Sequence, residues 1–353
     1  MLKTYGWSDR LQREFEPHAA QGLVAGRVIA QHRGLLTLMT AEGEVRAEIA
    51  GRLGREGEPA DWPAAGDWVA ASPPTAGSRA VIRHVLPRGA TFTRRSPEGR
   101  VQVIAANVDL ALLTLSMEAV PNLRRLERYL TVAWAGGAQP MVLLTKADLC
   151  AEAAQAIEAV NRIAGGAPVI RLSVVSGEGL EAVRQAMAPG VTAVMVGASG
   201  AGKSTLANTL LGQARMAVGE VRGDDARGRH TTSHRELILL PGGGLLLDTP
   251  GMRELSLDDV GEGLHVAFDD VDALAARCRF KDCTHGAEPG CAVAAALASG
   301  ELDDGRWRSF QKLTRESAHQ AAREDPLLRE RSRRRWITIH KANRARYKDR
   351  DRE

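Results

Sequence analysis

The sequence contains no hydrophobic run long enough to cross a membrane. Its longest apolar window, 103–115, is interrupted by Asn107 and Asp109, whereas a membrane-spanning helix needs about 20 predominantly apolar residues. The N-terminus also lacks the charged start and apolar stretch that mark a signal peptide. These absences exclude an ordinary secreted or membrane-spanning protein, and they predict a cytoplasmic protein with no membrane partner.

Cysteine is scarce, with four residues in a chain of 353. Three of them lie with a histidine in the pattern CxxxxCxHxxxxxC, formed by Cys278, Cys283, His285 and Cys291. Cys3His is a complete tetrahedral ligand set with no open position, so it predicts one structural zinc ion per chain. A disulfide is disfavoured in the cytoplasm, which leaves a chance cluster as the alternative. Cys150 stands apart and is expected to be a small apolar residue near a helix start.

The composition is that of an ordinary globular protein, but the charge is uneven. The chain is 44% hydrophobic and 25% charged, and it is long enough for two or three domains. The net charge is +4, yet residues 327–353 hold eleven Lys/Arg against four Asp/Glu. A basic tail of this kind predicts contact with an anionic polymer, and a solvated charged helix is the alternative.

The most informative segment is a GxxxxGKS motif between an apolar run, 191–196, and a helix-compatible stretch that begins at Thr205. In this context the motif predicts a phosphate-binding loop, whose backbone amides turn toward a di- or triphosphate at a helix N-terminus. We expect the lysine to reach the outer phosphates and the serine hydroxyl to ligate Mg²⁺. The loop consists of Gly197, Ala198, Ser199, Gly200, Ala201, Gly202, Lys203 and Ser204, and Thr205 follows it.

The region before this domain reads as a small barrel. Five short β-like runs between 22 and about 95 are separated by Gly, Pro and Asp, which favours an OB-like barrel. Arg88, Arg94 and Arg95 beside Phe92 are a candidate RNA-binding face with an aromatic platform. Ser8 is expected to cap a short docking helix in the N-terminal extension.

From 108 onward strand-like stretches, such as 169–172, alternate with helix-like stretches, such as 123–135 and 180–186. This alternation predicts an α/β domain with a doubly wound, mostly parallel sheet. Ligands bind such sheets at the carboxyl ends of the strands. One predicted strand end is followed by Thr145, Lys146, Ala147 and Asp148, which fit the [NT]KxD element that reads guanine. The carboxylate can accept both hydrogen bonds that guanine donates, and adenine would leave these acceptors unpaired.

Two further segments complete a guanine-nucleotide site. Ser173 and Val174 follow the next strand, where a backbone amide could meet the guanine carbonyl oxygen. Downstream of the phosphate loop, Thr231 or Thr232 is a candidate Mg²⁺ ligand in a polar, glycine-rich switch segment. The later DxxG element supplies Asp248, which would support Mg²⁺, and Gly251, whose amide would sense the γ-phosphate.

The order of these elements is unusual. The base-reading segments precede the phosphate loop, whereas ordinary GTPases have the opposite order, so the chain is predicted to be circularly permuted. A phosphoryl-transfer kinase and an RNA-binding scaffold with a decayed nucleotide site are the alternatives. The combination of 145–148 with 248–251 disfavours the kinase, and the intact Lys203, Ser204 and Asp248 disfavour the scaffold.

With the sequences RGRHTTSH, DTPGMREL and CRFKDCTHGAEPGC in this order, the chain resembles the RsgA (YjeQ/YloQ) family of circularly permuted GTPases. The resemblance implies a GTP hydrolase that is stimulated by the small (30S) ribosomal subunit and acts in late 30S maturation through 16S rRNA binding. Mg²⁺ with GTP and structural zinc are the implied metals, and a monomer is expected. Thr145 departs from the commoner Asn, and an extension precedes the barrel.

The resemblance also points to His230 as the residue that positions the attacking water, beside Lys203 in the catalytic set. Many GTPases use a Gln directly after DxxG, but this chain has Met252, whose thioether cannot orient water. A switch-surface histidine without a catalytic part is the alternative. The predicted domains are an N-terminal extension (1–21), an OB-like barrel (22–98), a permuted P-loop GTPase domain (99–257), a helical zinc-binding domain (258–326) and a basic tail (327–353).

Overall fold

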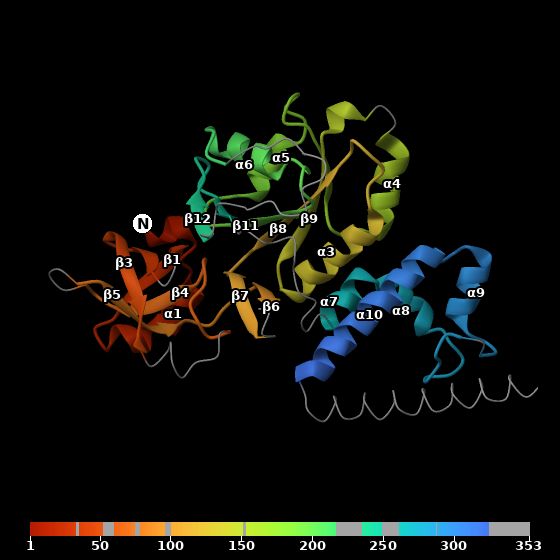
Figure 1. The fold of residues 1–353 in the computed structure, drawn as a ribbon, viewed down its shortest axis with the longest axis horizontal. Helices are drawn as coiled ribbons and strands as arrows, with labels where there is room; N and C mark the ends of the chain where they lie inside the picture. The colour runs from red at the N-terminus through yellow and green to blue at the C-terminus, as the bar shows by residue number, and fades with distance from the viewer. Residues whose placement is uncertain are drawn as a thin grey trace, which may run out of the picture.

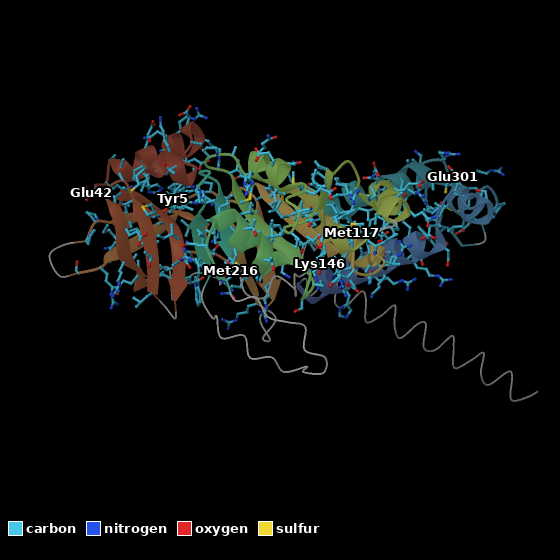
Figure 2. All side chains as sticks on the ribbon, turned by 90° about the horizontal axis from the view of Figure 1, so that it is seen from above. Tyr5, Glu42, Met117, Lys146, Met216 and Glu301 are labelled. Carbon is cyan, nitrogen blue, oxygen red and sulfur yellow. The ribbon has the colours of Figure 1, made fainter. Side chains whose placement is uncertain are left out.

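The computed structural model describes residues 1–32, 35–51, 60–74, 78–95, 100–150, 153–216, 235–248, 261–286 and 288–324. The molecule is elongated, with a β-barrel at one end, helices α8–α10 at the other and a sheet with flanking helices between them (Figure 1). Glu42 and Glu301 lie toward these opposite ends, and Lys146 lies between them (Figure 2). Among the described residues, no helix is both long and apolar enough to span a membrane.

The barrel begins after an N-terminal 3-10 turn and helix α1, which Ser8 caps by accepting a hydrogen bond from the Leu11 amide. The strands run in the order β1-β2-β3-β5-β4, and an additional β1–β4 pairing closes them. Apolar side chains such as Val28, Leu38 and Ile82 fill the interior. The bounds are η1 (Leu2–Tyr5), α1 (Asp9–Ala19), β1 (Val24–His32), β2 (Leu35–Thr40), β3 (Gly43–Ile49), β4 (Trp68–Ser72) and β5 (Ala80–Val85).

A separate antiparallel pair, β6 (Thr91–Arg95) and β7 (Val101–Ala106), follows the barrel. The side chain of Phe92 in β6 is only 1% exposed. Arg88 is also engaged, since it donates to both carboxylate oxygens of Asp67 at 2.9 and 2.8 Å. The prediction that Phe92 forms an aromatic platform for RNA is therefore wrong, because its ring belongs to the core.

The central sheet has the strand order β10-β9-β8-β11-β13-β12, in which all pairs are parallel except β12–β13. The strands are near-continuous apolar runs because both faces are covered. The bounds are β8 (Leu110–Ser116), α3 (Leu123–Ala135), β9 (Gln139–Thr145), η2 (Ala147–Leu149), α4 (Ala153–Ile163), β10 (Val169–Leu172), α5 (Leu180–Ala186), β11 (Thr192–Gly197), α6 (Lys203–Leu211), β12 (Arg235–Leu239) and β13 (Leu245–Asp248).

Alternate residues of each strand belong to different cores. Leu113 and Val142 pack in the cluster that contains α3 and α4 residues. Their neighbours Leu112 and Leu143 pack in the cluster that contains α5 and α6 residues. This period of two sends alternate side chains to opposite faces of the sheet, and helices cover both faces. The parallel pairing of β8, β9, β10, β11 and β13 places their carboxyl ends at one edge.

The C-terminal helices are anchored to α3. Gly263 leaves no room for a side chain, because a Cβ there would lie 2.3 Å from the Ala135 amide nitrogen. The buried Arg306 donates to both carboxylate oxygens of Asp270 at 2.6 Å and to Glu127 of α3 at 3.2 Å. Burial raises the pKa of Glu127, and Ser309, Arg124 and Arg306 oppose this rise. The bounds are α7 (Gly261–Ala267), α8 (Asp269–Ala275), α9 (Ala292–Ser299) and α10 (Asp304–Glu324).

Candidate functional site

The predicted phosphate loop lies between β11 and α6, at the carboxyl edge of the sheet. Gly200 and Gly202 have φ values of +77° and +82°, a region that L side chains rarely adopt. A Cβ on Gly197 would lie 2.0 Å from the Thr114 hydroxyl oxygen, so a side chain is excluded there. The Lys203 ammonium group donates to the Gly197 and Ala198 carbonyl oxygens at 2.8 and 2.6 Å, which places its charge at the loop.

Thr145, at the end of β9, connects the predicted base-reading segment to this loop. Its side chain is 3% exposed. The hydroxyl group lies 2.9 Å from the Ala201 carbonyl oxygen of the phosphate loop and 3.1 Å from the Leu115 carbonyl oxygen of β8. With one proton to donate, the hydroxyl shares it between the two acceptors. Thr145 therefore acts as a tether between the two halves of the site, a function that requires a short polar side chain.

Asp148 lies in the short turn η2, beside the end of the neighbouring strand β10. The Ser173 hydroxyl donates to Asp148 Oδ1 at 2.6 Å and accepts from the Ser176 amide at 3.1 Å. The Ser173 side chain is fully buried. This contact holds Oδ1 of Asp148, and no described residue hydrogen-bonds to the other carboxylate oxygen.

One of the two backbone amides proposed to meet the guanine carbonyl oxygen is already bonded within the protein. The Ser173 amide donates to the Glu178 carbonyl oxygen at 3.0 Å. Of the two amides proposed to meet a guanine carbonyl, this leaves Val174 as the candidate.

Glu118, which was not predicted from the sequence, lies beside Lys146. The Lys146 ammonium group forms an ion pair with Glu118, which lies on the loop after β8. The Ser116 hydroxyl donates to the same carboxylate at 3.1 Å, and both contacts lower the pKa of Glu118, that of Lys146 most. Lys146 also has a φ of +57°, which is uncommon for a residue other than glycine. No motif marks Glu118, because it comes close to Lys146 only through the β8–β9 pairing.

The predicted magnesium residues come from neighbouring elements. Asp248 ends β13, which pairs in parallel with β11, and Ser204 is the second residue of α6. Oxygen ligands of this kind fit Mg²⁺. His230, Thr231, Thr232, Gly251 and Met252 lie outside the described residues, as does the basic tail.

Cys278, Cys283, His285 and Cys291 come together, and one ligand atom from each lies within 4.8 Å of all the others. Cys278 Sγ lies 3.9 Å from Cys291 Sγ and 3.5 Å from His285 Nδ1. Tetrahedral zinc bonds of the usual lengths give S–S and S–N separations of about 3.8 and 3.6 Å, so these spacings fit the ion. The predicted cluster can therefore hold a metal ion.

Glu288 organises the loop around His285, and sequence analysis did not identify it. Its carboxylate accepts hydrogen bonds from the Thr284 and Gly286 amides at 3.0 and 2.8 Å. The hydrogen bond from the Thr284 hydroxyl is the largest of the causes that lower its pKa to about 2. These bonds hold the two amides that flank His285, whose φ is +59°.

Comparison with known proteins supports this arrangement. A family model described as RsgA GTPase matches residues 85–258. The small ribosomal subunit biogenesis GTPase RsgA of Opitutus terrae is 46% identical and covers 98% of this chain and 97% of its own. The chain belongs to the RsgA GTPase family. The protein of the same name from Streptomyces coelicolor is 45% identical over 93% of this chain and 90% of its own.

Solved structures agree on the fold. YjeQ from Thermotoga maritima has a TM-score of 0.63 at 25% identity and covers 83% of this chain and 98% of its own. YloQ, described as a circularly permuted GTPase, has a TM-score of 0.59 at 22% identity. The predicted family and fold class are thereby confirmed: a permuted P-loop GTPase domain with an N-terminal barrel and a C-terminal helical domain that carries the Cys3His cluster.

Proposed function

We propose that this protein is a GTP hydrolase that is stimulated by the small ribosomal subunit and acts in late maturation of that subunit. The observation that carries the proposal is the convergence of four chemistry-bearing segments at the carboxyl ends of β9, β10, β11 and β13. Two hydrogen bonds connect the first three, from Thr145 to Ala201 and from Ser173 to Asp148, and β13 pairs in parallel with β11. Full-length relatives named as small ribosomal subunit biogenesis GTPases support the role in the ribosome.

Guanine recognition falls to Asp148, with Lys146 and the Val174 amide beside it. The carboxylate accepts from the guanine ring N–H and the exocyclic amine, and the lysine stem lies along the ring. Adenine has no matching pair of donors, so a bound adenine would cover the Asp148 carboxylate, which is exposed in this structure, and leave it unpaired at a cost of about 1–3 kcal/mol. GTP should therefore be selected over ATP.

Phosphate binding falls to the loop 197–204, with its backbone amides, the Lys203 ammonium group and the adjoining Thr205. Ser204, Asp248 and one of Thr231 and Thr232 are the proposed ligands of Mg²⁺, which neutralises phosphate charge when it is bound. The Gly251 amide is proposed to sense the γ-phosphate.

His230 is the proposed residue that orients the attacking water, since the Met252 thioether cannot do so. Turnover by the isolated protein should then be slow. Partners that complete the catalytic site of a GTPase stimulate it ~10³- to 10⁵-fold, and the same range is proposed for the 30S subunit.

The remaining proposals concern the C-terminal region and the ribosome. The Cys3His cluster is proposed to bind one structural zinc ion, because its four ligands leave no position open. The C-terminal domain and the basic tail are proposed to bind 16S rRNA. A ribosomal partner implies a cytoplasmic protein, which we propose to be a monomer with the five domains given above.

GTP turnover by the purified protein, measured with and without 30S subunits, tests the proposal. ATP controls for the base and 50S subunits control for the partner. A 30S-specific rise in phosphate release with GTP is expected. If 30S subunits give no rate above the intrinsic one, the ribosomal role is refuted.

A further inference from the structure

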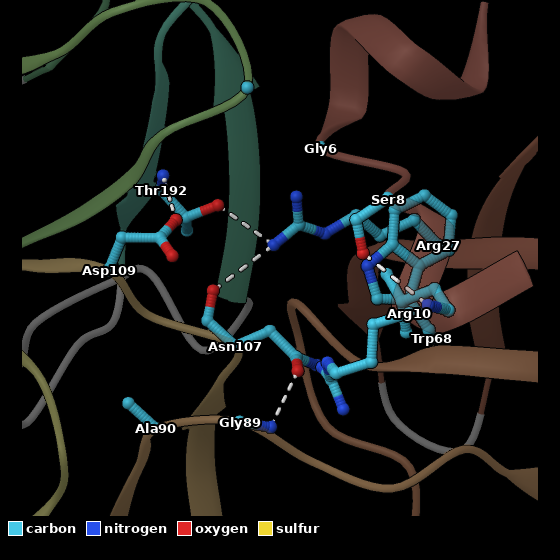
Figure 3. Close-up of a pocket in the computed structure, with 12 residues that line it drawn as sticks. Gly6, Ser8, Arg10, Arg27, Trp68, Gly89, Ala90, Asn107, Asp109 and Thr192 are labelled. Atoms are coloured by element: carbon cyan, nitrogen blue, oxygen red, sulfur yellow. Dashed lines mark hydrogen bonds between the residues drawn. The ribbon is translucent and has the colours of Figure 1, made fainter. Parts of the chain in front are cut away.

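Arg27 of β1 holds four separate parts of the molecule together. Its guanidinium group donates to the Gly66 carbonyl oxygen at 3.2 Å, the Asn107 carbonyl oxygen at 3.3 Å and the Thr192 hydroxyl oxygen at 2.8 Å. It also donates to the Tyr5 carbonyl oxygen. These partners belong to the barrel, the segment before β8, strand β11 and the N-terminal extension. Figure 3 shows the contacts to Asn107 and Thr192. The planar, multiply donating head of arginine suits such a junction.

Thr192, whose hydroxyl oxygen accepts from Arg27, is also held in place. The Thr192 amide donates to Asp109 Oδ2 at 2.8 Å, so this residue of β11 is held through both its backbone and its side chain (Figure 3). Arg27 is 2% exposed. Burial lowers its pKa to about 10, while Asp109 and Asp67 act to raise it, so the group remains charged at neutral pH. The junction is therefore a buried, oriented contact.

The N-terminal extension closes over the same junction. A Cβ on Gly6 would lie 2.8 Å from the Gly190 carbonyl oxygen, just before β11. Trp7 packs edge-on against Trp68 with ring centroids 4.8 Å apart, and the Arg27 guanidinium lies over the Trp68 ring at 5.3 Å. A cavity of about 240 Å³ adjoins these residues.

The same strand β1 also joins the GTPase sheet at the magnesium side. Ala30 of β1 is paired with Glu236 of β12, and Glu236 is paired with Asp248 of β13. The Arg235 side chain donates to Gln31 at 3.3 Å. One ladder thus leads from the barrel to the residue proposed to support Mg²⁺. Arg235 also continues directly from the segment that contains 230–232.

The barrel therefore contacts three strands that carry the triphosphate machinery. Arg27 reaches β11, which leads into the phosphate loop, and β1 pairs with β12. A Cβ on Gly66 would lie 3.0 Å from a Leu247 methyl carbon in β13. Hydrogen-bonded strands move together, so a displacement of β1 displaces β12 and the end of β13.

We propose that the 30S subunit also contacts the barrel and that β1 transmits this contact to the hydrolytic site, with Arg27 as the positioning residue that fixes β1 against β11. The inference rests on the proposed function, and it adds the barrel to the C-terminal domain and the basic tail as a part of the chain that meets the subunit. Neither Arg27 nor Thr192 contacts the nucleotide in this scheme.

Thr192→Val tests the proposal, because it keeps the shape of the side chain and removes the oxygen that Arg27 contacts. Thr131→Val is the matched control: Thr131 is equally buried, but its hydroxyl bonds only within α3, to the Glu127 carbonyl oxygen at 2.9 Å. Arg27→Lys is a second variant, which keeps the positive charge but replaces the planar guanidinium, with its several N–H donors, by a single ammonium group. Basal turnover, 30S-stimulated turnover, 30S binding and the melting temperature are measured for each.

We expect Thr192→Val to lower the 30S-stimulated rate about tenfold or more, with basal turnover and 30S affinity within about twofold of wild type. Thr131→Val should match wild type. A folded Thr192→Val protein with the wild-type stimulated rate would overturn the proposal, and so would equal losses of basal and stimulated rate. If wild type itself is not stimulated, the proposed function fails rather than the coupling.

Hydrogen exchange gives a readout independent of the subunit. In wild type, a non-hydrolysable GTP analogue should slow exchange in peptides from both β12 and β1. In Thr192→Val the β12 response should persist while the β1 response is weakened, because the β1–β12 ladder remains but Arg27 no longer fixes β1 against β11. A β1 response equal to that of wild type would refute transmission through this junction.

Discussion

Replacement of Thr145 by Val tests whether the base-reading and phosphate-binding halves of the site are mechanically joined. The hydroxyl group is buried and lies within hydrogen-bond distance of Ala201 in the phosphate loop and Leu115 in β8. Val keeps the shape but removes the donor, which leaves both carbonyl groups without this partner. Loss of one buried hydrogen bond costs about 1–2 kcal/mol, equivalent to about 5- to 30-fold in affinity when the loop must be ordered by the ligand.

The assay is fluorescence titration with labelled GDP and GTP. Thr145→Val should weaken both nucleotides to the same degree, because the tether acts on the loop rather than on the γ-phosphate. Thr145→Ser should restore binding, since it returns the hydroxyl group. The control Thr131→Val removes a buried hydroxyl of α3 and should leave affinity unchanged. Wild-type affinity in Thr145→Val would refute the tether.

Three further predictions concern the metal cluster and the hydrolytic step. Cys283→Ala, or chelation of the metal, should unfold the C-terminal region, because metal binding energy is largely folding energy. Circular dichroism should show the loss of helix while GDP affinity stays near wild type. Parallel loss of helix and of GDP affinity would contradict a separable module. Glu288→Ala should free the amides beside His285 and weaken zinc binding by about 10- to 100-fold in a chelator competition, whereas unchanged affinity would assign the carboxylate no organising role. His230→Ala should remove most of the 30S-stimulated phosphate release but preserve GTP affinity, and a wild-type stimulated rate would exclude this histidine.

Local patterns predicted the elements of the GTPase domain well. The expected helices 123–135 and 180–186 and the strand 169–172 match α3, α5 and β10. These elements are determined locally, by the spacing of their apolar residues and by the polar residues that flank them. The Asn122 side chain, for example, caps α3 by accepting from the Arg125 amide.

Contacts between segments far apart in the chain could not be predicted from local sequence patterns. Glu118 meets Lys146 only because β8 and β9 are neighbours, and the pairing of Ala30 with Glu236 joins segments about two hundred residues apart. Phe92 and its arginines resembled an RNA-binding surface because polar neighbours do not reveal that the ring is buried. Strands β6 and β7 were not predicted. Each is short and pairs with the other in a separate two-stranded sheet, so neither stands out by its local sequence.

Guanine recognition by Asp148 is best tested with the variant Asp148→Asn. Ser173 donates to Asp148 Oδ1 at 2.6 Å, and the carbonyl oxygen of Asn can accept the same bond, which turns its NH₂ group toward the base. Xanthine carries a carbonyl where guanine carries the exocyclic amine, so it can accept from that group. Turnover of GTP and XTP is measured for both proteins with 30S subunits. We predict that the variant loses GTP turnover and gains XTP turnover, whereas retention of GTP turnover without a response to XTP would contradict the account.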